Sequence, residues 1–191
     1  SSSHALVGGL IGAVLMGANA SDIHWGLDEI RQGRLVGVFK IITALLISPL
    51  IGFTMGFILH KFMRLILRAA APSANKKLRR AQWVTAAALA FAHGTNDAQK
   101  GMGIITLMLV LGGFLGDFSV PFWVILVSAA SITIGTLLGG WRIVRTVGFG
   151  IYKLGPLHGF DVQLASTAVI FGASIFGGPV STTHVVSTAI M

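Results

Sequence analysis

The sequence predicts an all-α integral membrane protein, and three observations support this fold class. First, 54% of the 191 residues are hydrophobic and only 10% are charged, whereas a soluble domain has roughly 25% charged residues. Second, apolar stretches of membrane-spanning length recur along the chain. Third, the basic residues gather between these stretches, as they do in cytoplasmic loops. The chain has no cysteine, so neither a disulfide nor a cysteine-based metal site is expected.

The first segment is predicted to enter the membrane only part of the way, and the second to lie outside the membrane. Residues 1–21 contain an apolar, glycine-rich run at 5–17. A helix over 5–17 reaches only about 20 Å, too short for about 30 Å of hydrocarbon, so we expect half of a re-entrant hairpin. Residues 22–40 have charges of both signs. They are expected outside the membrane, with Asp22 capping a short interfacial helix.

A spanning helix and a basic loop come next. Residues 41–60 contain no Asp, Glu, Lys or Arg and are predicted to cross the membrane with a kink at Pro49. Residues 61–81 are predicted to form a cytoplasmic loop. Its basic residues are Lys61, Arg64, Arg68, Lys76, Lys77, Arg79 and Arg80. They fix the topology, with binding of acidic lipid headgroups as an additional role. A nucleic-acid patch is the alternative that their position between apolar segments disfavours.

Residues 82–116 predict a broken transmembrane helix. Gly94 and Asn96 are poor helix formers, and the charged Asp97 and Lys100 follow within an otherwise apolar stretch. A charge at mid-membrane depth costs about 2.5–3.5 kcal/mol, and unpaired backbone groups cannot face lipid. We therefore expect the break to line a cavity, as breaks do in the substrate sites of secondary transporters.

Three segments complete the predicted topology: a spanning helix at 118–140, a cytoplasmic basic loop at 141–159 and a re-entrant hairpin at 160–191. The connection 116–120 has no basic residue and is expected outside. With both basic loops inside, the element 82–116 must cross fully. The half-length elements at the two ends of the chain then enter from opposite faces, which predicts an inverted repeat with re-entrant half-helices.

Two matching motifs support the repeat. Ser1-Ser2-Ser3-His4 matches Ser181-Thr182-Thr183-His184, hydroxyl for hydroxyl and histidine for histidine. Consecutive hydroxyls at a helix start lie beside unpaired backbone N–H groups and the positive end of the dipole, where an anion such as phosphate binds. The residues expected to bind the anion are Ser1, Ser2, Ser3, Ser181, Thr182 and Thr183.

These motifs resemble those of a known family. The run His93-Gly94-Thr95-Asn96-Asp97-Ala98-Gln99-Lys100-Gly101 resembles the Gly-x-Asn-Asp motif of the inorganic phosphate transporter (PiT) family, bacterial type. The hydroxyl motifs resemble the Pro-x-Ser-Thr/Ser-Thr/Ser-His motif of each half of that family. The resemblance implies a fragment running from the motif of the first repeat to that of the second. It also implies a multi-pass protein of the bacterial inner membrane.

The resemblance further implies symport of inorganic phosphate with a cation, either Na⁺ or H⁺. Asn96 is expected to donate to a phosphate oxygen, and Asn96 with Asp97 to hold the coupling cation. Asp97 would be the metal ligand if the cation is Na⁺, and a helix cap is its alternative role. Gln99 and Lys100 are further phosphate candidates, although Lys100 equally suits neutralising Asp97.

Other roles and functions stay open at this point. His4 and His184 either pack against the opposite hairpin or take part in proton coupling. Sulfate or another tetrahedral oxyanion is the alternative substrate. An anion channel would need a polar stripe that the segments 41–59 and 118–140 lack. An intramembrane hydrolase using Ser181 with His184 lacks a Gly-x-Ser-x-Gly run, so no enzyme is expected.

The expected partners follow from these inferences. They are phosphate, Na⁺ or H⁺ and the lipid bilayer, with no nucleic acid and no cofactor beyond the coupling ion. A homodimer is left open.

Overall fold

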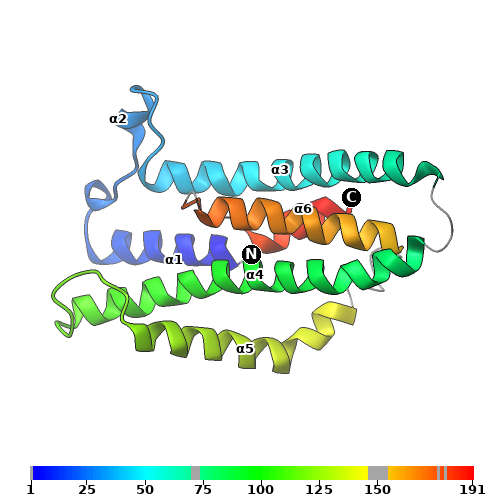
Figure 1. The fold of residues 1–191 in the computed structure, drawn as a ribbon. Helices are drawn as coiled ribbons and strands as arrows, with labels where there is room; N and C mark the ends of the chain where they lie inside the picture. Colours follow the sequence, from blue (N-terminus) through cyan, green and yellow to red (C-terminus); the bar gives the residue numbers. More distant parts are fainter. Residues whose placement is uncertain (1, 70–73, 146–154, 176, 179) are drawn as a thin grey trace.

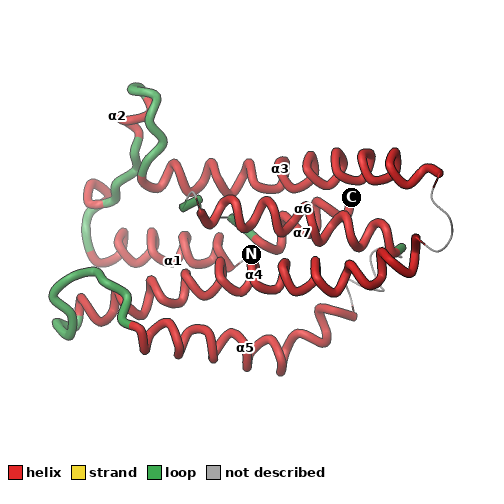
Figure 2. The backbone as a smooth tube through the Cα atoms, viewed as in Figure 1, coloured by secondary structure: helices red, strands yellow, loops and turns green. Residues whose placement is uncertain are grey.

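The computed structural model describes residues 2–69, 74–145, 155–175, 177–178 and 180–191. Within these residues the secondary structure consists of α-helices, two short 3₁₀ turns and loops (Figure 2). The prediction of an all-helical protein is therefore confirmed for the described part of the chain. The helices run along one common direction, and both termini of the chain lie between them (Figure 1).

Helix α1 (Ser2–Gly17) is apolar along its whole length and buries only Ser3. It begins at the first hydroxyl motif, and the turn η1 (Ala20–Asp22) follows it. Asp22 does not cap a following helix, contrary to expectation. Its carboxylate Oδ2 accepts a hydrogen bond of 3.0 Å from the backbone N–H of Asn19, because Asp22 is the third residue of its own turn and reaches back to the turn's start.

The segment around α2 (Leu27–Ile30) is held against the start of α3 (Gly37–Ile66). The backbone N–H of Val38 donates to the carbonyl of His24 at 3.0 Å. Gly26 and Gly37 have positive φ angles of 78° and 61°, and an added Cβ on Gly37 would overlap the His24 carbonyl. This close approach of two backbones requires glycine, since any side chain there would separate them.

Helices α3 and α5 (Phe122–Arg145) contain the two candidate membrane spans, Gly37–Ile66 and Phe122–Trp141, which are long and apolar enough to cross a bilayer. Both end later than predicted, at Ile66 and Arg145 instead of residues 60 and 140, whereas α5 begins later than predicted, at Phe122 instead of residue 118. Helix α3 continues through Pro49, and α5 enters the segment 141–159 that was expected to be a loop. Basic residues at the end of a helix interact favourably with its dipole. The basic residues that suggested loops after residues 60 and 140 are therefore also compatible with the last turns of α3 and α5.

Helix α4 (Ala74–Leu111) corrects two predictions. It is one unbroken helix of 38 residues, so the break expected within 82–116 is absent, and the residues from 74 onward of the expected loop 61–81 are helical. Gly94 costs only about 1 kcal/mol relative to alanine in a helix. The alanine-rich run before it and packing against neighbouring helices outweigh that cost. The two expected half-helices thus form a single element.

The remaining helices form a hairpin beside α4. Helix α6 (Pro156–Ile175) starts before the predicted residue 160, and α7 (Thr182–Ile190) returns along it. The reversal uses Gly177 with φ 62°, and the backbone N–H of Gly178 donates to the carbonyl of Ala173 at 2.8 Å. The two helices pack against each other and against α3.

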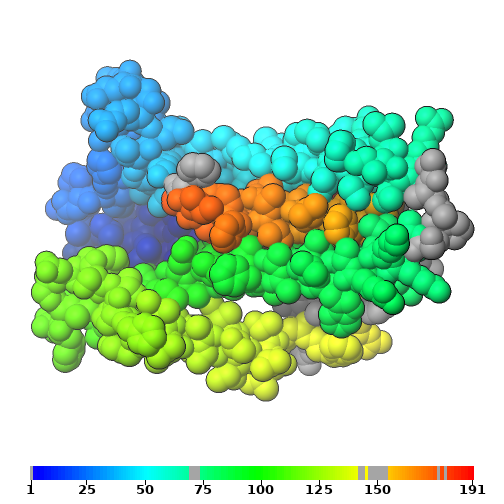
Figure 3. Space-filling view, in the orientation of Figure 1, coloured from blue at the N-terminus to red at the C-terminus, as the bar shows by residue number. Residues whose placement is uncertain are grey.

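Packing around α6 organises the molecule. Helix α6 lies between α3 and α4, and α5 covers the other face of α4 (Figure 3). The buried core joins Ala92 of α4, Ile170 of α6 and Val185 of α7. The end of α3, the start of α4, the end of α5 and the start of α6 lie at one end of the molecule (Figure 1). The connections after α1 and after α4 lie at the other end.

Candidate functional site

The two hydroxyl motifs meet in space. The Ser3 hydroxyl donates a hydrogen bond of 3.2 Å to the carbonyl of Val180, the residue before the second motif. The rings of His4 and His184 lie with their centroids 5.2 Å apart. From this meeting point α1 and α7 run toward opposite ends of the molecule (Figure 1). The N-termini of two helices therefore face one small region, and Ser1 lies outside the described residues.

The second motif starts its helix as expected. Ser181 is the N-cap of α7, and its hydroxyl oxygen accepts a bond of 3.4 Å from the backbone N–H of His184. Ser3, Ser181 and Thr182 are all at most 3% exposed. Ser2 and Thr183 are exposed in the described chain. The structure thus brings three of the hydroxyl candidates together inside the molecule and leaves two at its surface.

Asn96 links the middle of α4 to this meeting point. Its side chain is buried, at 4% exposure, and its Nδ2 donates to the Val180 carbonyl at 3.5 Å. The same carbonyl accepts from Ser3. Because one carbonyl oxygen joins both side chains, the Gly-x-Asn-Asp motif and the two hydroxyl motifs form one cluster.

Asp97 lies beside Asn96 between two nitrogen groups of its own helix. Its Oδ2 is 2.9 Å from the Nε2 of His93, and its Oδ1 is 2.6 Å from the Nζ of Lys100. Asp97 is in the middle of α4, so the alternative that it caps a helix is wrong. The contact with Lys100 shows the neutralising role that the sequence left open. These two contacts reduce the cost of burying most of the carboxylate.

His93 is a member of the cluster that the site prediction missed. Besides Asp97, its Nε2 lies 3.5 Å from the hydroxyl of Thr182. A signal was present in the sequence, because His93 precedes Asp97 by four residues and residues at this spacing are neighbours on one helix face. The predicted break between them concealed that spacing.

A cavity of about 540 Å³ opens on the other side of Asn96. Its lining includes two lysines and two side-chain amides, and the lining residues are Gly37, Lys40, Ile41, Asn96, Gln99, Lys100, Ser174, Gly177 and Gly178. The sequence prediction missed Lys40, since it was placed in a segment outside the membrane. The Lys40 ammonium favours an anion in this cavity, whereas the charge of Lys100 is balanced by its contact with Asp97.

Over the residues that the structure describes, no group of three or more His, Cys, Asp or Glu side chains is arranged to hold a metal ion. Both carboxylate oxygens of Asp97 already contact nitrogen groups. Na⁺ at Asp97 would therefore compete with these positively charged or N–H donor groups for the same carboxylate.

Comparisons with known proteins place the chain in a family independently of this geometry. The model of the phosphate transporter family matches residues 1–191. A "Probable low-affinity inorganic phosphate transporter" of Bacillus subtilis is 42% identical over 193 residues, covering 100% of the chain and 55% of that protein. A protein of the same name from Rhizobium meliloti is also 42% identical, with the same coverage.

A more distant relative of the same name, from Mycobacterium leprae, is 36% identical over 195 residues, covering 100% of the chain and 45% of that protein. The chain thus spans about half the length of the curated relatives that it matches. No solved structure matches the chain.

Proposed function

The chain belongs to the phosphate transporter family, and we propose that it forms part of a secondary carrier that moves inorganic phosphate across a bacterial cell membrane together with a cation. The observation that supports this most directly is the meeting of the two hydroxyl motifs at the N-termini of α1 and α7. The similar proteins are named for phosphate transport.

The phosphate would bind at the meeting point of α1 and α7. Each helix N-terminus presents unpaired N–H groups and a partial positive charge, and two of them directed at one point reinforce each other. The hydroxyls of Ser3 and Thr182 both donate and accept, which suits a partly protonated oxyanion. The cavity beside Asn96, with Lys40 and Lys100 in its wall, offers the anion a route of entry.

The coupling cation would act at Asp97. In the structure its two oxygens contact His93 and Lys100. A Na⁺ ion bound there, or a proton, would replace one of these contacts and release a positive group toward the phosphate. Lys100 would then neutralise Asp97 before the cation binds and contact the phosphate afterwards. This arrangement would favour phosphate binding when the cation is bound, which is the requirement for symport.

The membrane arrangement of the proposal uses α3, α4 and α5 as crossing helices. Helix α1 and the hairpin of α6 and α7 would be the re-entrant elements of an inverted repeat. The opposite directions of α1 and α7 support this (Figure 1). The basic ends of α3, α4 and α5 share one end of the molecule, which supports a cytoplasmic position for that end.

The geometry does not favour the hydrolase alternative. Ser181 contacts His184 through the backbone N–H of the histidine, whereas the imidazole ring of His184 lies against His4. A nucleophile requires its base within hydrogen-bond reach of the hydroxyl. A capping role explains Ser181 fully, so transport is the better supported function.

Uptake measured with the full-length protein in proteoliposomes tests the proposal. Labelled phosphate or labelled sulfate is supplied outside, with an imposed Na⁺ gradient, H⁺ gradient or neither. We expect saturable, gradient-dependent accumulation of phosphate, inhibited weakly by sulfate. Equal accumulation of sulfate would widen the substrate class to tetrahedral oxyanions. Absence of saturable uptake and of phosphate exchange would refute the transport function.

A further inference from the structure

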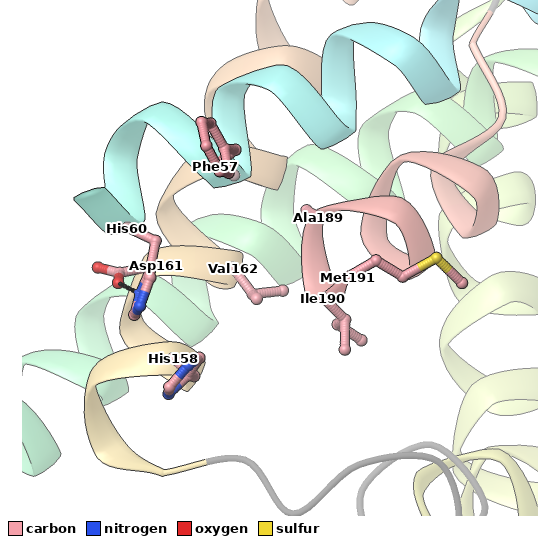
Figure 4. Close-up of a pocket in the computed structure, with 9 residues that line it drawn as sticks. Phe57, His60, His158, Asp161, Val162, Ala189, Ile190 and Met191 are labelled. Atoms are coloured by element: carbon pink, nitrogen blue, oxygen red, sulfur yellow. Dashed lines mark hydrogen bonds and ion pairs between the residues drawn. The ribbon is translucent and has the colours of Figure 1, made fainter. Parts of the chain in front are cut away.

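A second polar cluster lies apart from the anion site, where α3 and α6 approach each other. Asp161 of α6 is 2% exposed, and its Oδ2 is 2.8 Å from the Nδ1 of His60 on α3. The ring of His158, three residues before Asp161 on α6, stacks on that of His60 with a centroid distance of 4.4 Å. Figure 4 shows the three side chains at one side of a pocket.

His60 contacts both Asp161 and His158, so the charge of each of these side chains affects the others. A buried carboxylate without a positive partner is costly, and two stacked imidazolium rings would repel each other. A proton lies between His60 and Asp161 in their hydrogen bond, whichever of the two carries it. Over the described residues, the other oxygen of Asp161 is buried without a hydrogen-bond partner. It can therefore receive a proton directly, as a carboxylic acid.

Neighbouring elements add little charge to the cluster. On α4, the uncharged Gln82 faces α6 and donates to the carbonyl of Pro156 at 2.9 Å. On α3, the Nζ of Lys61 lies 4.6 Å from the centre of the Phe57 ring, at the pocket wall. The pocket residues at the end of α7 are Ala189 and Ile190, and Met191 follows them; none of the three titrates. His60 and His158 are thus the groups that set the protonation of Asp161.

Helix α7 connects this cluster to the anion site. The pocket has a volume of about 300 Å³ and separates His60, His158 and Asp161 from residues 189–191 (Figure 4). The same helix starts at the anion site with Ser181 as its N-cap. It packs closely on α3, because a Cβ on Gly56 would lie 2.8 Å from the carbonyl oxygen of Ala189. A displacement of α7 would therefore change the wall of the pocket, and this is the physical link between the two sites.

We propose that His60, Asp161 and His158 form a proton-binding site linked to the anion site through α7. A proton from solution forms an N–H bond on the His60 imidazole, or an O–H bond on Asp161, and leaves by the same bond. His158 stacks on His60 at the pocket wall and restricts the orientation of its ring. This inference rests on the proposed transport of phosphate, and it adds a site of proton uptake separate from Asp97.

The test uses the full-length protein in proteoliposomes and compares Asp161→Asn with wild type. Two quantities are measured: exchange of labelled for unlabelled phosphate at equal pH, and phosphate-dependent proton entry followed with a pH-sensitive dye in the lumen. We expect Asp161→Asn to keep exchange and to lose proton entry. The control Asp117→Asn makes the same change at an exposed loop residue and should keep both.

His60→Gln is the second variant, so that the test still gives a result if Asp161→Asn does not fold. It should also keep exchange and lose proton entry. Proton entry at the wild-type level in both variants would overturn the inference. Loss of exchange together with proton entry in both would overturn it as well, because the cluster would then support the fold. Wild-type protein without phosphate exchange would instead refute the transport function itself.

Discussion

The hydroxyl of Ser3 donates to the carbonyl of Val180 across 177 positions of sequence. This contact joins the starts of two helices that contain the same motif. It also places the carbonyl of Val180 where Asn96 reaches it from a third helix. The candidate site is thus joined by hydrogen bonds from α1 and from α4 to the residue that precedes the second motif.

The first prediction concerns Thr182. Replacement of Thr182 by valine keeps the shape and removes a buried hydroxyl that lies 3.5 Å from His93. Loss of a hydrogen bond to a charged ligand costs about 1.5–3 kcal/mol, so the affinity for phosphate should fall by roughly ten- to hundredfold. Thr188→Val is the control, since the Thr188 hydroxyl donates within α7, to the carbonyls of His184 and Val185, and packs beside Gly52 of α3. Equal affinities of the two variants in exchange assays would remove Thr182 from the site.

The second prediction concerns Asp97. Asp97→Asn keeps the shape of the side chain and removes the charge that holds Lys100 at 2.6 Å. We expect the variant to fold and reach the membrane, and to lose the dependence of uptake on the coupling cation. Some phosphate binding should survive, because the hydroxyls and helix N-termini remain. The measurement is uptake against cation concentration at matched expression. A cation dependence equal to that of wild type would contradict the role of Asp97.

The third prediction concerns topology. Single cysteines at Asn75 and Asp117 should react with an impermeant thiol reagent from opposite sides of the membrane. Both positions are exposed, and α4, at 38 residues, spans the distance between them. Labelling of both from the same side would show that α4 does not cross the bilayer. Such a result would also remove the support for the inverted repeat.

The fourth prediction concerns the contact between α3 and α7. Gly56→Ala places a Cβ 2.8 Å from the backbone oxygen of Ala189, so the two helices must separate. Overpacking of this kind costs about 1–3 kcal/mol, and the thermal unfolding temperature of the purified protein should fall. Gly135→Ala on α5, where a Cβ meets nothing within 4 Å, is the control. An unchanged unfolding temperature for Gly56→Ala would show that the contact is loose.

The sequence was sufficient for the features that depend on local chemistry. Hydroxyl residues before apolar runs predicted the starts of α1 and α7, and charge composition predicted a helical membrane protein. It was not sufficient for α4, where weak helix formers at Gly94 and Asn96 were outweighed by their flanks and by packing. His93 was missed as a consequence, because its spacing to Asp97 has meaning only in an unbroken helix.

The pairing of His60 with Asp161 was beyond local reasoning for a different reason. The two residues are 101 positions apart and belong to segments that the sequence treated as a spanning helix and a hairpin. Nothing in either segment specifies which face of α3 meets α6. That choice is made by packing over the whole contact, in the way that Gly52 and Gly56 of α3 allow the backbone of α7 to approach closely.

The continuity of α4 restricts how a carrier of this kind can move. An unbroken helix of 38 residues is about 57 Å long at ~1.5 Å per residue, and it behaves mechanically as a stiff rod. A rod does not fold at its centre, so Asp97 cannot swing between the two sides by bending its own helix. If the site opens alternately to the two sides of the membrane, the movement must come from the shorter helices that end beside α4. Gly177, between α6 and α7, is then the expected hinge.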